Sequence, residues 1–368
     1  MDRAMVYFTD FRMKIGQNHE SKLRKLMKAA GMDKIDFDGK YVAIKIHFGE
    51  LGNLAFLRPN FAKYVADYVK ELGGKPFLTD CNTLYVGSRK NALDHLDTAN
   101  INGFNPMSTG CQILIGDGLK GTDEVEVPVA GGVLCKTAKI GRAIMDADIV
   151  ISLNHFKGHE ATGFGGALKN LGMGCGSRAG KMEMHSYGKP YVEQENCIGC
   201  KACARVCAHD APRFGADGKA TIDHDKCVGC GRCIGVCPKD AVCAGESDSF
   251  DNLNRKIAEY AKAVVDGRPN FHINIVNQVS PNCDCHSESD AAIVPDVGMF
   301  ASFDPVAIDV ASAAAVNRQP VNPMSILRER AGWDDRFNGT HPTTNWRVGT
   351  QHAEDIGLGT QEYELITL

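Results

Sequence analysis

Short apolar runs alternate with amphipathic segments along the first half of the chain. The runs are predicted to be strands and the amphipathic segments helices; the strands are Tyr41–Phe48, Pro76–Thr79, Ile113–Ile115 and Asp148–Leu153, and the helices are Ser21–Ala30, Pro59–Leu72 and Arg89–Asn100. In Pro59–Leu72, apolar residues recur at steps of three and four, between an initial proline and a final Gly73-Gly74. Strands that alternate with helices indicate an α/β fold with a mainly parallel sheet.

The last third of the chain continues the alternation. It contains two predicted helices, Asn252–Val265 and Pro305–Ala315, and one predicted strand, His272–Val276. So few elements bury too little surface for an independent core. We therefore expect residues 247–368 to complete the α/β domain that residues 1–189 begin, with residues 190–246 as an inserted module. A separate C-terminal domain is the alternative.

Composition narrows the class of protein. The 368 residues are 43% hydrophobic and 23% charged, as in ordinary globular proteins, and the formal net charge of −4 argues against a nucleic-acid binder. We expect no membrane span, because there is no run of about 18 apolar residues. An acid at Asp2 is unlike a signal peptide. Fifteen cysteines without such a signal indicate metal or redox chemistry in a reducing, anaerobic cytoplasm.

Eight of the fifteen cysteines form one duplicated motif. A C-x2-C-x2-C-x3-C run recurs 30 residues later, and its spacing suits [4Fe–4S] clusters. In two-cluster ferredoxins the fourth cysteine of each run ligates the other cluster. The predicted ligands are Cys197, Cys200, Cys203 and Cys237 for cluster 1, and Cys227, Cys230, Cys233 and Cys207 for cluster 2. Two zinc sites are the alternative, but two complete runs in register argue against them.

Residues 190–246 therefore resemble a bacterial-type two-[4Fe–4S] ferredoxin, which implies an α+β, ferredoxin-like module. Ala208 departs from the family pattern, which has proline there. Each oxidised cluster with its four thiolates carries a charge of about −2, which would take the net charge from −4 to about −8. We therefore expect a redox partner protein with a basic face.

Motifs outside this module resemble the Fe–S centre proteins built on domain of unknown function 362. The matching segments are Asp80-Cys81-Asn82-Thr83-Leu84-Tyr85, His155-Phe156-Lys157-Gly158-His159, Gly165-Gly166-Ala167-Leu168-Lys169-Asn170-Leu171-Gly172, Cys283-Asp284-Cys285 and Ser302-Phe303-Asp304-Pro305-Val306-Ala307-Ile308-Asp309. The resemblance covers most of the chain. It implies a family and a fold rather than a reaction.

Polar residues follow the predicted strands at the edge where α/β sheets bind ligands. The candidates for cofactor or anion binding are His155, Lys157, His159, Lys169, Asp80 and Asn82. His155 and His159 are either a metal pair or hydrogen-bonded loop histidines. The glycines from Gly163 to Gly166 either expose backbone N–H groups that hold a small anion together with Lys169, or allow close packing.

A second cysteine cluster lies late in the chain. Cys283 and Cys285 are candidate ligands of an extra soft-metal site, with Cys175 as a completing ligand. Reduced free thiols are the alternative.

Three functions fit these patterns. The first is an iron–sulfur oxidoreductase that transfers electrons through two clusters to a site or partner at the α/β domain. The second is a maturation or assembly factor that supplies electrons or metal to another enzyme. The third is a ligand-binding protein whose clusters are structural.

Overall fold

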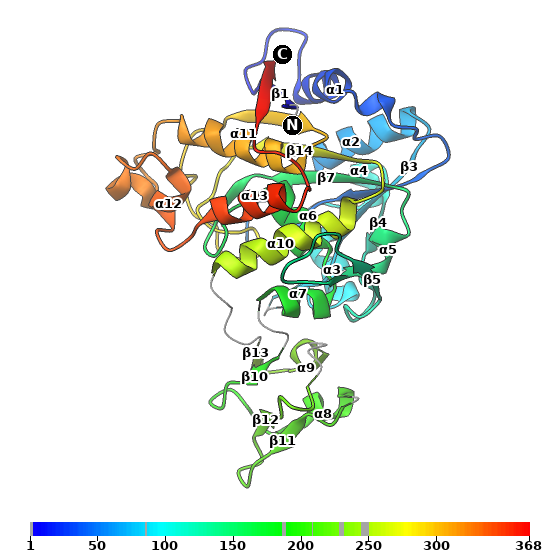
Figure 1. The fold of residues 1–368 in the computed structure, drawn as a ribbon, viewed down its shortest axis with the longest axis vertical. Helices are drawn as coiled ribbons and strands as arrows, with labels where there is room; N and C mark the ends of the chain where they lie inside the picture. Colours follow the sequence, from blue (N-terminus) through cyan, green and yellow to red (C-terminus); the bar gives the residue numbers. More distant parts are fainter. Residues whose placement is uncertain (1–2, 85–86, 186–188, 208, 228–231, 244–249) are drawn as a thin grey trace.

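An eight-stranded sheet forms the centre of the protein (Figure 1). The structure is a computed structural model, and it describes residues 3–84, 87–185, 189–207, 209–227, 232–243 and 250–368. The order is β16-β1-β15-β14-β7-β2-β3-β4. These strands are β1 (Ala4–Asp10), β2 (Tyr41–Lys45), β3 (Lys75–Asp80), β4 (Gln112–Ile115), β7 (Ile149–His155), β14 (Asn270–Val276), β15 (Gly298–Ser302) and β16 (Tyr363–Thr367). Of the eight, β15 alone runs against its neighbours, so the predicted mainly parallel α/β sheet is confirmed.

The sheet draws strands from both sides of the eight-cysteine segment. β14, which follows that segment, pairs in parallel with β7, which precedes it, with Phe271 opposite Ile151. β15 then pairs with both β14 and β1. The sheet is therefore one structure built from chain segments far apart in sequence.

Alternating side chains of the strands pack on two layers of helices. Ile149, Ile151 and Leu153 of β7 belong to the core that also contains buried residues of α1 (His19–Ala29) and α2 (Pro59–Glu71). Val150 faces the other core, with residues of α6 (Ala167–Cys175) and α10 (Phe250–Val265). α11 (Pro305–Asn317) packs on the same side against β14 and β15. This two-residue alternation is what a strand buried on both faces requires.

The remaining elements of this α/β unit are short helices and two hairpins. The helices are α3 (Ala92–Ile101), α4 (Pro106–Thr109), α5 (Arg142–Met145), α7 (Arg178–His185), α12 (Arg336–Thr340) and α13 (Trp346–Asp355), with 3-10 turns at Met32–Lys34 and Ile326–Arg330. The hairpins are β5 (Glu124–Pro128) with β6 (Thr137–Gly141), and β8 (Lys157–His159) with β9 (Gly163–Gly165). None of the helices in the described residues combines the length and apolar character that a bilayer span requires.

The segment with the eight cysteines folds into a small unit at one end of the molecule, beyond α7 (Figure 1). This cysteine-rich unit contains two antiparallel pairs, β10 (Tyr191–Val192) with β13 (Val242–Cys243) and β11 (Pro212–Phe214) with β12 (Ala220–Ile222). Its helices are α8 (Ala202–Val206) and α9 (Arg232–Gly235), and α9 lies nearer to α7 than α8 does (Figure 1). Its boundaries at residues 190 and 246 and its likeness to ferredoxin stay predictions.

Candidate functional site

A cavity of about 430 Å³ lies at the carboxyl ends of the central strands. His47 follows β2, Asp80 ends β3 and His155 ends β7, and all three line the cavity. From β2 the strand order runs outward through β3 to β4, whereas β7 and β14 lie on the other side of β2. The order therefore reverses between β2 and β7, and open α/β sheets bind ligands at such a switch point.

Most of the residues predicted from strand ends meet at this cavity. Asp80, His155, Lys157, His159 and Lys169 line it. Asn82 is not part of the lining. Its backbone and side-chain N–H groups donate to the Asp117 carboxylate, at 2.9 and 2.8 Å, so it holds the turn after β4 in place.

Asp80 is held by buried cations. Its carboxylate lies 2.9 Å from Lys45 Nζ and 3.6 Å from Arg89 Nη1, and all three side chains are buried. Burial alone would raise the pKa of Asp80, but Lys45 and the neighbouring cations outweigh burial and lower it. Arg89 Nε also bonds Glu50 at 3.0 Å. These charges compensate one another and stabilise the strand ends.

His155 and Lys157 both bind the buried carboxylate of Asp284. His155 Nδ1 lies 2.8 Å from Asp284 Oδ2, and His155 Nε2 lies 2.8 Å from the Asn277 carbonyl oxygen. The ring thus bridges a carboxylate and a backbone carbonyl. Lys157 Nζ lies 3.3 Å from the same carboxylate. His155 and Lys157 therefore fix the loop after β14, which carries Cys283 and Cys285.

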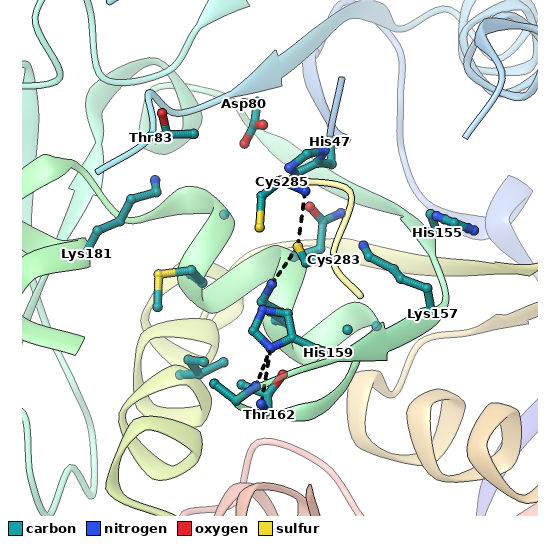
Figure 2. Close-up of a pocket in the computed structure, with 18 of the residues that line it drawn as sticks. His47, Asp80, Thr83, His155, Lys157, His159, Thr162, Lys181, Cys283 and Cys285 are labelled. Atoms are coloured by element: carbon teal, nitrogen blue, oxygen red, sulfur yellow. Dashed lines mark hydrogen bonds between the residues drawn. The ribbon is translucent and has the colours of Figure 1, made fainter. Parts of the chain in front are cut away.

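Hydrogen-bond donors surround the sulfur of Cys283. Lys169 Nζ lies 3.1 Å away, and the backbone N–H of Cys285 lies 3.4 Å away. His159 Nδ1 accepts backbone N–H bonds from Ala161 and Thr162, at 3.1 and 3.2 Å, so the ring proton is on Nε2. That Nε2–H is the group left to bond Cys283. Figure 2 shows Cys283 between Cys285 and the His159 ring.

These contacts separate the two thiols by acidity. The Cys285 thiol, the Lys169 ammonium and His159 together lower the pKa of Cys283 well below its usual value, against the effect of burial. The bond to Cys283 and burial raise the pKa of Cys285. Burial alone would lower the pKa of Lys169, but the Cys283 thiolate outweighs burial and raises it. The surroundings therefore favour the thiolate form of Cys283 and the neutral thiol of Cys285.

Two overlapping groups at this cavity bring potential metal ligands within 4.8 Å of one another. They are His159 with Cys283 and Cys285, and Glu160 with Cys285 and His286. His159 is poorly prepared to ligate, because its Nδ1 is already an acceptor and its Nε2 carries the proton. The ammonium of Lys169 beside Cys283 would also repel a cation.

Cys175 lies away from the Cys283–Cys285 pair. It is the last residue of α6 and is buried in the core that α6 shares with α10, and its Sγ lies 3.8 Å from the Asn170 carbonyl oxygen. It is absent from both groups of potential metal ligands found among the described residues. The structure therefore does not bring the three predicted ligands of an extra metal site together.

A carboxylate occupies the first turn of α6. The Asp309 side chain accepts the backbone N–H groups of Ala167 and Leu168, at 2.7 and 2.9 Å. These two N–H groups are therefore satisfied within the protein. A Cβ on Gly166 would overlap the same carboxylate, which supports the close-packing alternative at that position. An anion held by the backbone of residues 163–166 with Lys169 stays a prediction, and Lys169 Nζ lies 3.1 Å from Cys283 Sγ.

Four cysteines from both halves of the duplicated motif line one small cavity of the cysteine-rich unit. They are Cys197, Cys200, Cys203 and Cys237. Cys197 Sγ accepts the backbone N–H of Ala220 at 3.3 Å. Of the other predicted ligands, Cys207, Cys227 and Cys233 are partly buried, and Cys230 lies outside the described residues.

The cysteine-rich unit packs on the α/β unit next to the large cavity. Leu84 and Met182 of the α/β unit share a buried apolar cluster with Cys203, Ile234 and Val242. Leu84 also lines the large cavity, as does Lys181, the neighbour of Met182 on α7. Lys90 and Asp240 form an ion pair across the same contact.

Lys45, Glu160 and Lys181 were not named from the sequence, and Asp284 and Asp309 appeared there only as members of family motifs, without a role. Glu160 is adjacent to His159 and Asp284 lies between two cysteines, so their position beside candidate residues was a usable signal. Lys181 and Asp309 come from helices that only tertiary packing brings to the site, so no local pattern reveals what they contact.

Comparison with known proteins identifies a family. The similar solved structures include the lactate racemase apoprotein from Thermoanaerobacterium thermosaccharolyticum, with 10% identity, a TM-score of 0.40, and coverage of 74% of this chain and 51% of that one. They also include a Thermotoga maritima protein from a structural genomics consortium, with 12% identity, a TM-score of 0.34, and coverage of 80% and 56%.

The chain thus spans about half the length of these two proteins, and likenesses at such TM-scores carry no argument about activity. The comparison with curated proteins found no match. Residues 42–314, which are most of the chain, match the domain of unknown function DUF362, and the protein therefore belongs to the DUF362 family.

Proposed function

We propose that the protein is an iron–sulfur electron carrier that moves electrons through two [4Fe–4S] clusters to the cavity of the α/β unit. The observation that carries this proposal is the shared cavity of Cys197, Cys200, Cys203 and Cys237. Three of these cysteines come from the first run and the fourth from the second. This is the exchanged ligand set of a two-cluster ferredoxin.

The spacing of the sulfurs supports clusters rather than zinc. Four thiolates on one tetrahedral zinc ion, each at about 2.3 Å, lie about 3.8 Å apart. Among the described cysteines of the motif, no three bring their sulfurs within 4.8 Å of one another. A single tetrahedral zinc ion would need a closer group, whereas a cube of four irons, which supplies one-electron chemistry when bound, takes its four thiolates at separate corners.

Backbone donors prepare the unit to hold negative sulfur. The N–H groups of Ala220 and Ala211 point to Cys197 and Cys207, at 3.3 and 3.4 Å. Such bonds stabilise thiolate ligands and tune cluster potentials. Ile198, beside the exposed Cys200, is 61% exposed and marks the face that a redox partner with a basic surface would approach.

The contact at Leu84 and Met182 provides a short path for electrons from the cysteine-rich unit to the large cavity. Both residues pack with the cysteine-rich unit, and Leu84 also lines the large cavity. Ligands of both predicted clusters lie at this contact. Cys203 of cluster 1 belongs to the buried apolar group there, and Ile234 of the same apolar group is on α9, the helix that carries the cluster 2 ligand Cys233 (Figure 1).

Metal and sulfide analysis of the anaerobically purified protein tests the proposal. We expect about eight irons and eight inorganic sulfides per chain. Cys197→Ser should lower both by about half, whereas Cys243→Ser, in the same unit but outside the motif, should leave them unchanged. Two zinc ions and no sulfide would refute the proposal.

A further inference from the structure

The Cys283–Cys285 pair has a chemistry of its own within the cavity. We propose that these two cysteines form a reversible dithiol–disulfide couple that reduces a low-molecular-mass disulfide bound in the cavity. This inference goes beyond the proposed electron carrier, and its geometry does not depend on the clusters.

The two sulfurs are placed to join. They lie within 4.8 Å of one another, on residues separated only by Asp284, and both line the cavity of about 430 Å³. Bond formation needs an approach to about 2.05 Å, which rotation of the two cysteine side chains can supply. A cavity of this volume accommodates a small organic ligand.

The surroundings of Cys283 favour attack by its sulfur. Thiol–disulfide exchange proceeds through a thiolate, and cations or N–H donors beside a cysteine stabilise that form. Lys169 Nζ and the Cys285 N–H lie 3.1 and 3.4 Å from Cys283 Sγ, and His159 adds a third donor. A neutral thiol would not need three donors around its sulfur, whereas a thiolate does.

The same groups argue against a resident metal. Lys169 places a positive charge against the sulfur that a metal would need, and Lys169 is itself in the cavity wall. A cation and an ammonium at the same thiolate repel each other. The arrangement therefore suits a thiolate that reacts rather than one that ligates.

The exchange occurs in two balanced steps. The Cys283 thiolate attacks one sulfur of the bound disulfide RSSR, which forms a Cys283–SR bond and releases RS⁻. The Cys285 thiol then loses its proton and attacks Cys283 Sγ, which forms the Cys283–Cys285 disulfide and releases the second RS⁻. The proton passes to solvent, which reaches the site where Glu160 and His286 are 40% and 41% exposed. The substrate gains two electrons and the dithiol loses two.

Two electrons and one proton restore the Cys283 thiolate and the Cys285 thiol. Under the proposed function, these are as many electrons as two one-electron clusters deliver together. The couple would then be the acceptor of these electrons.

The test uses the full-length protein and cystine as the probe. The protein is reduced, freed of reductant under argon, mixed with cystine, alkylated and analysed by peptide mass spectrometry. We expect the peptide with Cys283 and Cys285 to lose two hydrogens and to resist alkylation. Each chain should release two molecules of free cysteine from one cystine. Cys285→Ser should instead trap a cysteine adduct on Cys283. Cys111→Ser, a buried cysteine outside the cavity, should behave like the wild type.

Lys169 variants separate a reactive thiolate from a merely buried one. Lys169→Met should slow adduct formation in the Cys285→Ser protein by about tenfold or more, and Lys169→Arg should restore most of the rate. Equal rates in all three proteins, or no adduct on Cys283, would overturn the inference. The inference would also be overturned if metal analysis found a metal ion in addition to the cluster irons and this ion were missing from the Cys283→Ser/Cys285→Ser protein. If anaerobically purified protein forms the disulfide but contains no iron or inorganic sulfide, the electron-carrier proposal alone is refuted.

Discussion

Asp284→Asn is the substitution that most directly tests what holds the loop after β14, residues 277–286, which carries Cys283 and Cys285. The Asp284 side chain is fully buried and lies between His155 and Lys157, with Oδ2 2.8 Å from His155 Nδ1 and 3.3 Å from Lys157 Nζ. Asparagine has nearly the same shape but carries no charge. The substitution therefore leaves the Lys157 ammonium, which is 8% exposed, without its anion.

The loss of unfolding free energy in Asp284→Asn is large because the ion pair is buried. Removing one partner of a buried ion pair destabilises a protein by about 3–5 kcal/mol, which lowers the ratio of folded to unfolded protein by more than about a hundredfold. Lys157→Met in the Asp284→Asn background removes the stranded charge, and we expect it to recover about 2 kcal/mol. Because nearby cations lower the pKa of Asp284, its contribution is present above pH of about 4 and is lost only as the pH falls below that value.

Urea unfolding under argon, followed by circular dichroism at pH 7, measures this cost. Asp123→Asn is the matched control, because Asp123 and Arg142 form a similar pair at 2.9 Å with side chains that are 57% and 49% exposed. We expect the control to cost about 1 kcal/mol or less. Hydrogen exchange of residues 277–286 should accelerate in Asp284→Asn alone. If both variants lose the same small free energy, the buried carboxylate does not hold the loop.

Three further predictions concern other parts of the structure. Lys90→Glu places like charges opposite Asp240 across the contact between the two units, so hydrogen exchange in α7 should increase while the iron content stays unchanged. Gly158→Ala would overlap a carbonyl oxygen of the loop after β14 and should lower stability by about 1–3 kcal/mol in urea unfolding, whereas Gly332→Ala, with open space around it, should have little effect. Burial raises the pKa of Asp309 to about 6, above the ordinary value of 3.8, so its charged form is disfavoured in the folded state. Stability should therefore fall by about 3 kcal/mol between pH of about 4 and 6, and this part of the slope should be missing from Asp309→Asn when the two pH–stability curves are compared.

The elements that the sequence predicted well are those with local signals. The helix predicted over residues 59–72 forms as α2, Pro59–Glu71, because its proline start and its Gly73 stop lie in the sequence itself. The strand predicted to reach Phe48 ends at Lys45, because the apolar run continues into a buried loop and hydrophobicity alone cannot separate the two. β1, β15 and β16 were missed, since their pairing joins the two ends of the chain.

The residues of the site also fall into those that the sequence could predict and those that it could not. Asp80 and His155 were predictable because residues at the carboxyl ends of parallel strands meet at one edge of the sheet. The approach of Lys169 to Cys283 was not, because these residues are 114 positions apart and meet only when α6 packs over β7 and β14. The contact of the Asp309 carboxylate with the start of α6 was equally unpredictable, because α11 meets α6 only in the folded protein.

The position of β14 between β7 and β15 has a consequence for how this protein can be cut and for how it emerges during synthesis. A fragment that ends before β14 would leave the wholly buried strand β7 with an open, apolar edge, and such edges promote aggregation. The cysteine-rich unit is complete in the chain before that edge can be covered. A deletion that joins the two flanks directly should therefore stay soluble, whereas neither flank should do so when expressed alone.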